Sequence, residues 1–299
     1  TLGGDEDMQP DYVWIKNRGS AESHRNWDSV RGANKQLSAN NNNAESTATE
    51  GLTAFDSDGF TIGTDSTVNE NTKAIVAWCW KAGTTSGITT NGSTDITPSA
   101  YSFNTTSRIS IAKYAGQTTA GQLAHGLGTT PTFHIIKKSS AIGNWQVYSK
   151  AVGNTATLTL NETYATDANA YYYNNTDPDS VNITLGSGSS NTSVNTSGQT
   201  YICYSFADVQ GYSKSGQYTG NGNADGAFIY TGFRPAWILG KRTNAVEDWY
   251  IFDATRDAHN PISRLLYGNV ANAEYTGISA WMDICSNGFK IRTADGKIN

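Results

Sequence analysis

A repeated segment limits the folds open to this chain more than any other feature of its sequence. Three segments each begin with proline, continue through mainly apolar residues and reach lysine six positions later: PDYVWIK from Pro10, PTFHIIK from Pro131 and PAWILGK from Pro235. Self-similarity over a long spacing is typical of chains that are built from several copies of one folding unit. The sequence therefore predicts three diverged copies of one unit.

The copies stay in register without gaps well beyond these segments. Rings recur fourteen and seventeen residues after each proline, as His24 with Trp27, Trp145 with Tyr148, and Trp249 with Phe252. Large rings contribute more buried area than other side chains, so a ring kept at a fixed offset is typical of a core position. We therefore expect these rings to be structural positions of the repeat.

An acidic residue and an arginine follow the rings in two of the three copies. They are Asp28 with Arg31 and Asp253 with Arg256, whereas copy two has Ser149 and Val152 at these positions. Two carboxylates are what a glycosidase needs, but these two acids stand at one repeat offset. We therefore expect each acid to pair with its arginine in a structural role, and we predict no catalytic residues.

The composition favours strands and tight turns. Aromatic residues make up 11% of the chain and charged residues only 16%, and Asn, Ser, Thr and Gly supply most of the polarity. The apolar segments of the repeat have strand length, and WQVYSK and WYIFDA alternate as half-buried strands do. We predict an all-β chain of three tandem, diverged, β-sandwich or jelly-roll-like units, with about six or seven strands in each.

The repeat also predicts the boundaries of the units. Unit one spans 1–82 and lacks its first strand, a linker follows at 83–107, unit two spans 108–211, and unit three spans 212–299 and lacks its last strand. The strands AIVAWCWKA at 74–82 and TYICYSFADV at 200–209 have no counterpart in copy three. Two explanations stay open: the chain is a fragment, which is the simpler one, or a neighbouring chain covers the unpaired edges.

Charge, hydropathy and cysteine content argue against several classes of protein. A net charge of −5 argues against binding to nucleic acid or to an anionic membrane, because both need a positively charged surface. No apolar run is long enough to span a bilayer. The three cysteines form no disulfide framework. Asp56, Asp58 and Asp225 could be calcium ligands, but Asp-Gly turns are commoner. We expect no metal, no cofactor and no membrane insertion.

Aromatic residues outside the repeat pattern are the candidates for ligand binding. They are Tyr171, Tyr172 and Tyr173, followed by Asn174, together with Trp281 in copy three. Exposed rings stack on the C–H faces of sugars, and amides supply hydrogen bonds to the hydroxyl groups. The alternative is a strand of which one face is buried.

Longer blocks of the sequence resemble a known family. PDYVWIKNR, DSVRGANKQLSANNNNAE, FDSDGFTIGTDSTVN, AIVAWCWKAG and GYSKSGQYTGNGNADGAFIYTGFRPAWILGKRT are similar to a repetitive domain of tailed-bacteriophage proteins from marine and other environments. That domain is carried by large virion or tail-fibre-like proteins. The resemblance covers nearly the whole chain and implies location and class rather than activity.

We therefore expect a non-enzymatic structural or adhesion protein of a phage virion, in a tail fibre, capsid fibre or decoration. The expected partners are other virion proteins, further copies of the chain in a homo-oligomer such as a trimer, and a glycan of the host surface, with no nucleic acid. The alternatives are a secreted bacterial carbohydrate-binding or surface-filament protein and a polysaccharide-degrading enzyme.

Overall fold

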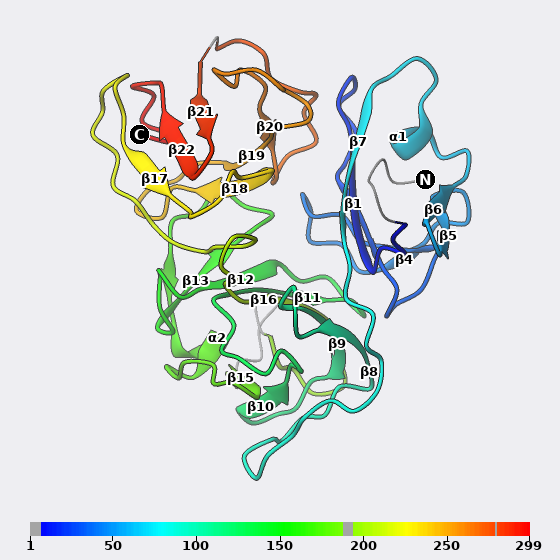
Figure 1. Cartoon of the computed structure of the whole chain (residues 1–299). Coiled ribbons are helices and arrows are strands. Elements are labelled where there is room, and N and C mark those ends of the chain that lie inside the picture. The colour runs from blue at the N-terminus through cyan, green and yellow to red at the C-terminus, as the bar shows by residue number, and fades with distance from the viewer. Residues whose placement is uncertain (1–6, 188–193, 279) are drawn as a thin grey trace.

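The computed structural model describes residues 7–187, 194–278 and 280–299, and it is built almost entirely from antiparallel strands. The all-β prediction is confirmed. The described helices are two single turns, α1 (Ser66–Asn69) and α2 (Ala170–Tyr173). Figure 1 shows three lobes around a common centre, coloured blue to cyan, green, and yellow to red along the chain.

Copy one forms a three-stranded sheet of order β2-β1-β7 and two small hairpins, β3–β4 and β5–β6. The strands are β1 (Tyr12–Asn17), β2 (Arg25–Asp28), β3 (Lys35–Gln36), β4 (Ser46–Thr47), β5 (Leu52–Asp56), β6 (Gly59–Ile62) and β7 (Ile75–Trp80). Every residue of β1 is buried, because β2 and β7 flank it on both edges.

Copy two holds the largest sheet, with the order β14-β13-β12-β11-β16-β9-β8, and a second sheet that pairs β10 with β15. Its strands are β8 (Ala100–Asn104), β9 (Ile109–Ala115), β10 (Gly121–Ala124), β11 (Phe133–Lys138), β12 (Trp145–Ser149), β13 (Ala156–Thr159), β14 (Asp167–Ala168), β15 (Asn182–Leu185) and β16 (Thr200–Phe206). A buried cluster fills the space between these two sheets and includes Tyr114, Leu123 and Cys203.

Copy three has two three-stranded sheets, of order β18-β19-β20 and β17-β22-β21. Its strands are β17 (Phe228–Tyr230), β18 (Trp237–Lys241), β19 (Trp249–Asp253), β20 (Leu266–Tyr267), β21 (Met282–Cys285) and β22 (Gly288–Ile291). Phe252, Trp281 and Ile291 belong to the buried cluster of this lobe.

The part of the repeat without gaps forms the same hairpin three times. In each hairpin the second residue after the proline pairs with the eighteenth: Tyr12 with Asp28, Phe133 with Ser149, and Trp237 with Asp253. These hairpins, β1–β2, β11–β12 and β18–β19, are called the repeat hairpins below. The division of the chain into three tandem sandwich-like units, of which the outer two are incomplete, stays a prediction.

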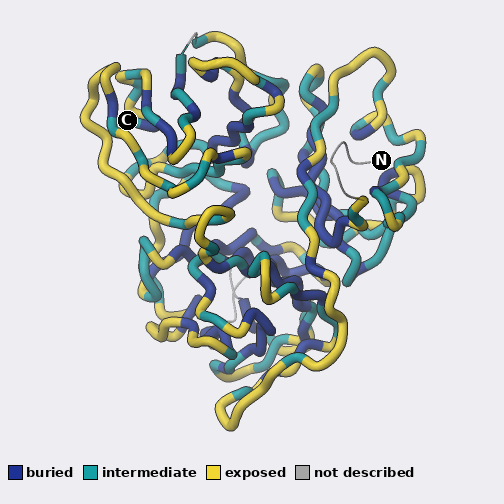
Figure 2. The backbone as a smooth tube through the Cα atoms, in the orientation of Figure 1, coloured by how far each residue is buried: buried dark blue, intermediate teal, exposed yellow. Residues whose placement is uncertain are grey.

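The repeat hairpins meet in one central core. A single buried cluster includes Trp14 of β1, Trp145 of β12 and Trp249 of β19, so all three copies contribute to it. In Figure 2 the buried segments lie toward the centre of the molecule and the exposed ones in the outer loops. The rings that the sequence pattern assigns to structural positions are buried: Trp27, Trp145, Tyr148, Trp249 and Phe252.

One expected linker is partly ordered as a strand. Within 83–107, residues 100–104 form β8, which pairs with β9 at the edge of the large sheet. Phe103 and Ser102 are buried there. The linker prediction rested on the low apolar content of the whole stretch and overlooked the alternation in its last part.

Candidate functional site

Two buried polar clusters begin at the predicted acid–arginine pairs. In copy three, Arg256 donates from Nε to Asp253 Oδ2 at 2.5 Å and from its backbone N–H to Oδ1 at 2.7 Å. In copy one, Arg31 makes the same two bonds to Asp28 at 2.5 and 2.8 Å. All four side chains are nearly inaccessible to solvent. The expected ion pairs are therefore present.

A glutamate completes each cluster. Arg256 donates from Nη1 to Glu274 at 2.6 Å, and Arg31 donates from Nη1 to Glu45 at 3.3 Å. Sequence reasoning missed both glutamates, although the triplet Asn-Ala-Glu at 43–45 and 272–274 is a signal that could have found them. The loops before the two triplets differ in length, which hides the match. We call these groups the Asp–Arg–Glu clusters.

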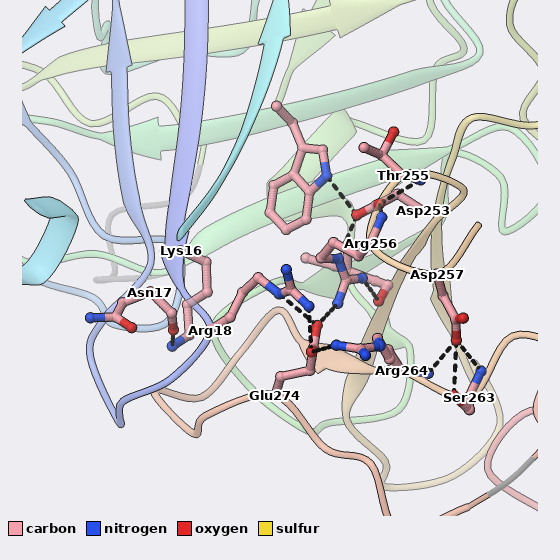
Figure 3. Close-up of polar contacts among 12 residues, drawn as sticks. Lys16, Asn17, Arg18, Asp253, Thr255, Arg256, Asp257, Ser263, Arg264 and Glu274 are labelled. Atoms are coloured by element: carbon pink, nitrogen blue, oxygen red, sulfur yellow. Dashed lines mark hydrogen bonds and ion pairs between the residues drawn. The ribbon is translucent and has the colours of Figure 1, made fainter. Parts of the chain in front are cut away.

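Glu274 also joins copy three to copy one. It accepts 3.0 and 2.8 Å hydrogen bonds from Arg18, which follows β1, and a 3.2 Å hydrogen bond from Arg264. Figure 3 shows the three guanidinium groups converging on this one carboxylate. Burial by itself would raise the pKa of Glu274, but the hydrogen bonds from Arg18 and Arg256 outweigh it and lower that pKa. The carboxylate therefore stays ionised.

A strand from the neighbouring copy donates to the acid of each cluster. Tyr204 on β16 donates its hydroxyl to Asp28 at 2.6 Å, and Trp78 on β7 donates its indole N–H to Asp253 at 3.0 Å. Trp78 and Tyr204 stand at matching places, because β1 and β11 pair with them at the same repeat position. Copy two, which has lost the acid, has Ser149 at this place.

The ring at the fourteenth position makes a second contact between copies. Trp145 donates to Ser38 O of copy one at 3.0 Å, and Trp249 donates to Thr159 O of copy two at 2.9 Å. His24 Nε2 lies 2.8 Å from Tyr267 O of copy three. The three contacts run from copy two to one, three to two and one to three, so they close a ring.

His24 takes the place of tryptophan in this ring as a neutral donor. Its Nδ1 accepts a hydrogen bond from Trp14 at 2.8 Å, which leaves the proton on Nε2 for the carbonyl of Tyr267. Burial lowers the pKa of His24 to about 3. The imidazole therefore mimics the indole N–H of the other two copies.

The lysine of each repeat is also removed from solvent: Lys16 and Lys137 are buried and Lys241 is half-buried. Lys137 donates to Lys138 O at 2.7 Å and to Asn42 O of copy one at 3.4 Å, and Lys241 donates to Thr163 O of copy two at 3.2 Å. Burial lowers the pKa of Lys16 to about 8, of Lys137 to about 7 and of Lys241 to about 8. Lys137 and Lys241 thus hold loop carbonyls of the neighbouring copy, whereas Lys16 donates to Asn17 O and Ser20 O of its own copy.

The Asp–Arg–Glu clusters are built for fixing structure. Each buried acid is held by an arginine and by a hydroxyl or indole of the adjacent strand. Asp28 and Asp253 are 0% and 4% exposed, so neither carboxylate can reach a polysaccharide as a glycosidase acid or nucleophile would. The arginines neutralise the buried carboxylates. The hydrogen bonds from Tyr204 and Trp78 fix the position of each cluster relative to the neighbouring copy.

The predicted ligand-binding residues do not form one surface patch. Tyr172, Tyr173 and Trp281 are 4%, 1% and 0% exposed, so their rings offer no face to a sugar and the expectation is corrected for them. Tyr171 is 59% exposed, and Asn174 follows it at the C-terminal cap of α2. Tyr173 packs inside copy two and Trp281 inside copy three, which also separates the two parts of the prediction.

The residues that the structure describes contain neither a metal-binding group of side chains nor a membrane-spanning helix. No group of three or more His, Cys, Asp or Glu side chains there is placed to hold a metal ion. Asp56 lies at the turn between β5 and β6 and accepts from Thr61 at 2.7 Å, and Asp225 pairs with Lys290 at 2.8 Å. No described helix is long and apolar enough to cross a membrane.

Comparison with known families gives one match. The family model described as Domain of unknown function (DUF7483) matches residues 5–299, which is nearly the whole chain. The chain belongs to this family. No curated protein and no solved structure matches it.

Proposed function

We propose that this DUF7483 protein is a non-enzymatic structural component of a bacteriophage virion that also contacts glycans of the host surface. The observation that carries the structural part is the closed ring of contacts between the three repeat hairpins. The sequence resemblance to tail-fibre-like proteins supports the location. Further copies of the chain and other virion proteins are the proposed partners.

The buried clusters fit a protein that has to keep one shape. Burying ion pairs costs desolvation energy, and such pairs contribute to a unique arrangement more than to net stability. Here the polar bonds cross from one copy to the next, as from Arg18 to Glu274 and from Tyr204 to Asp28. A rigid block of this kind suits a fibre or a decoration.

Labelling of native particles tests the location. Antibodies against the purified chain, bound to gold, should decorate virions of a phage that encodes it, at one symmetric position seen by electron microscopy. The control is the same phage with the gene deleted. Label found only on bacterial surfaces or in culture medium would contradict the proposal and favour the secreted bacterial alternative.

Glycan binding is proposed at the exposed end of α2. Tyr171 offers a ring there, and Asn174, in the left-handed conformation with φ 50°, lies beside it. On an array of bacterial surface glycans, Tyr171→Ala should lose the signal of the wild-type chain. Tyr164→Ala is the matched control, because Tyr164 is 54% exposed and should bind like wild type. Equal binding by the two variants would contradict the site.

A further inference from the structure

A cavity of about 320 Å³ opens at the surface of copy three, beside the end of strand β17. Its walls come from the turn that follows β16 and from the residues around the end of β17, and they include Asp208, Gln210, Lys214, Tyr230 and Gly232. Small-molecule sites in proteins usually have volumes of roughly 300–1,000 Å³. The cavity therefore has room for a small ligand.

Copy two contains a counterpart of each wall. Tyr114 donates to Val194 O and Tyr218 donates to Ile298 O, both at 2.6 Å, so the two tyrosines correspond, as do the residues four positions before them. Strands β10 and β17 each end two residues before a glycine, and these glycines have positive φ angles of 74° and 87°. The walls of the two copies therefore match position by position.

A phenylalanine fills this place in copy two. Phe103 of β8 pairs with Ser110, which corresponds to Lys214. A β-carbon on Gly126, the counterpart of Gly232, would lie 2.8 Å from the Phe103 ring. The Phe103 ring therefore occupies the space between these two walls.

Copy three leaves the same space open because its chain turns tightly there. The main chains of Val209 and Ser213 exchange hydrogen bonds of 2.9 and 3.0 Å, so residues 210–212 form a turn where copy two has the end of β8. Every residue of this turn is described. The turn thus leaves the cavity without a ring like that of Phe103.

The cavity combines an exposed ring with groups of opposite charge. Tyr230 is 61% exposed, and Lys214 Nζ lies 5.6 Å from the centre of its ring. Asp208 accepts from Thr132 Oγ1 at 2.7 Å and from the N–H of Ser215 at 2.9 Å. No carboxylate among the described residues forms an ion pair with Lys214. A charged donor and a charged acceptor are therefore both open to a ligand.

We propose that this cavity binds an uncharged sugar unit, which stacks on Tyr230 and bonds through its hydroxyl groups to Asp208, Gln210 and Lys214. A hydroxyl both donates and accepts, so it suits the carboxylate as well as the ammonium. Asp208 repels the carboxylate of an acidic sugar, and Lys214 repels the ammonium of an amino sugar. The Tyr230 ring offers an apolar face to the C–H groups of the sugar.

This second site rests on the proposed contact with glycans, but it does not need the site at Tyr171. Tyr171 belongs to α2 of copy two, whereas Tyr230 ends β17 of copy three. Each site has its own exposed ring. Loss of one ring should therefore leave binding at the other unchanged.

A titration of the intact chain, followed by its amide NMR shifts, tests the cavity. The probes are methyl glycosides of glucose, galactose and mannose, and the charged controls are glycosides of the matching uronic acids and amino sugars. A neutral glycoside should shift the amides of 208–214 and 230–232, and its charged analogues should bind more weakly by about ten-fold or more. No shift at these residues with any neutral glycoside, or tighter binding of a charged analogue, would overturn the proposal.

Two variants of exposed side chains test the roles of the ring and the ammonium. Tyr230→Ala should weaken binding by about ten-fold, because it removes the stacked ring, with an unchanged unfolding midpoint. Lys214→Gln keeps a donor and removes the charge, so the preference for the neutral over the amino glycoside should fall below about three-fold. Tyr171→Ala should bind in the cavity like wild type. Binding that is lost in Tyr171→Ala and kept in Tyr230→Ala would support the site in α2 and overturn this one.

Discussion

His24 shows how a single residue can keep a repeat contact while changing its chemistry. Two copies have tryptophan at this position, and each indole donates to a carbonyl of the next copy. The imidazole of His24 donates from Nε2 to Tyr267 O while its Nδ1 accepts from Trp14, and protonation of Nδ1 would leave the buried indole N–H of Trp14 without its acceptor. The hydrogen bond that anchors His24 in copy one therefore depends on pH.

Acid should weaken the fold through this residue. Burial lowers the pKa of His24 to about 3, of His125 to about 4 and of His134 to about 3, whereas an unfolded histidine titrates near 6.5. The unfolded chain therefore binds more protons below pH 6.5, and stability falls as pH drops from there toward 3. Urea unfolding at pH 7, 6, 5 and 4 should show this loss. A His24→Gln chain should show a shallower dependence, and an unchanged slope would refute the role of His24.

Much of the residue pattern could be predicted from sequence, but not all of it. The pairing of Asp28 with Arg31 followed from their repeat offset, because a hydrogen-bonded turn fixes their distance locally. The repeated Asn-Ala-Glu triplet marks Glu274, but the contact of Glu274 with Arg18 could not be predicted, because Arg18 lies in another copy. Local spacing carries no information about contacts between copies.

At the scale of elements, strand length and apolar pattern predict the repeat hairpins from the sequence. They do not predict the helical turn α2 or strand β8. The alternative interpretation of residues 171–173, a strand with one buried face, is wrong, because these residues form the helical turn α2. Asn169 caps its N-terminus by accepting from the N–H of Tyr171, and Asn174 ends it in the left-handed conformation. Strand β8 was hidden by the polar residues around it. Short elements depend on such caps and edges more than on periodicity.

Strands β7 and β16, which pair with β1 and β11, should each stabilise the Asp–Arg–Glu cluster of the neighbouring copy. Trp78→Phe removes the indole N–H that reaches Asp253 and keeps an aromatic ring in the core. The buried carboxylate of Asp253 then lacks one of its hydrogen-bond donors. This loss should lower the free energy of unfolding by about 1–3 kcal/mol. Chemical denaturation measures the loss.

Trp80→Phe is the matched control for this effect, since Trp80 lies on the same strand and packs against Tyr12 and Trp237. A cycle that combines Trp78→Phe with Asp253→Asn should show a coupling of about 0.5–3 kcal/mol between the two sites. Additive losses would show that the hydrogen bond contributes nothing beyond packing.

At the scale of the whole molecule, the three copies should unfold together. They share one central core, and Glu274 accepts from arginines of copies one and three. Removing this charge leaves Arg18 and Arg256 without their common partner. Removing one partner of a buried ion pair leaves an uncompensated charge in the folded protein. Glu274→Gln should therefore lower the free energy of unfolding by about 3–5 kcal/mol.

The effect should spread from copies one and three, which meet at Glu274, to copy two. Native-state amide exchange should speed up by a similar factor in β1, β11 and β19, because opening one lobe exposes the core of all three. Glu50→Gln, at an exposed glutamate, should change stability by less than about 0.5 kcal/mol. Faster exchange confined to copy three, with a separate unfolding transition for copy two, would show that the lobes are independent and that the ring of contacts does not couple them.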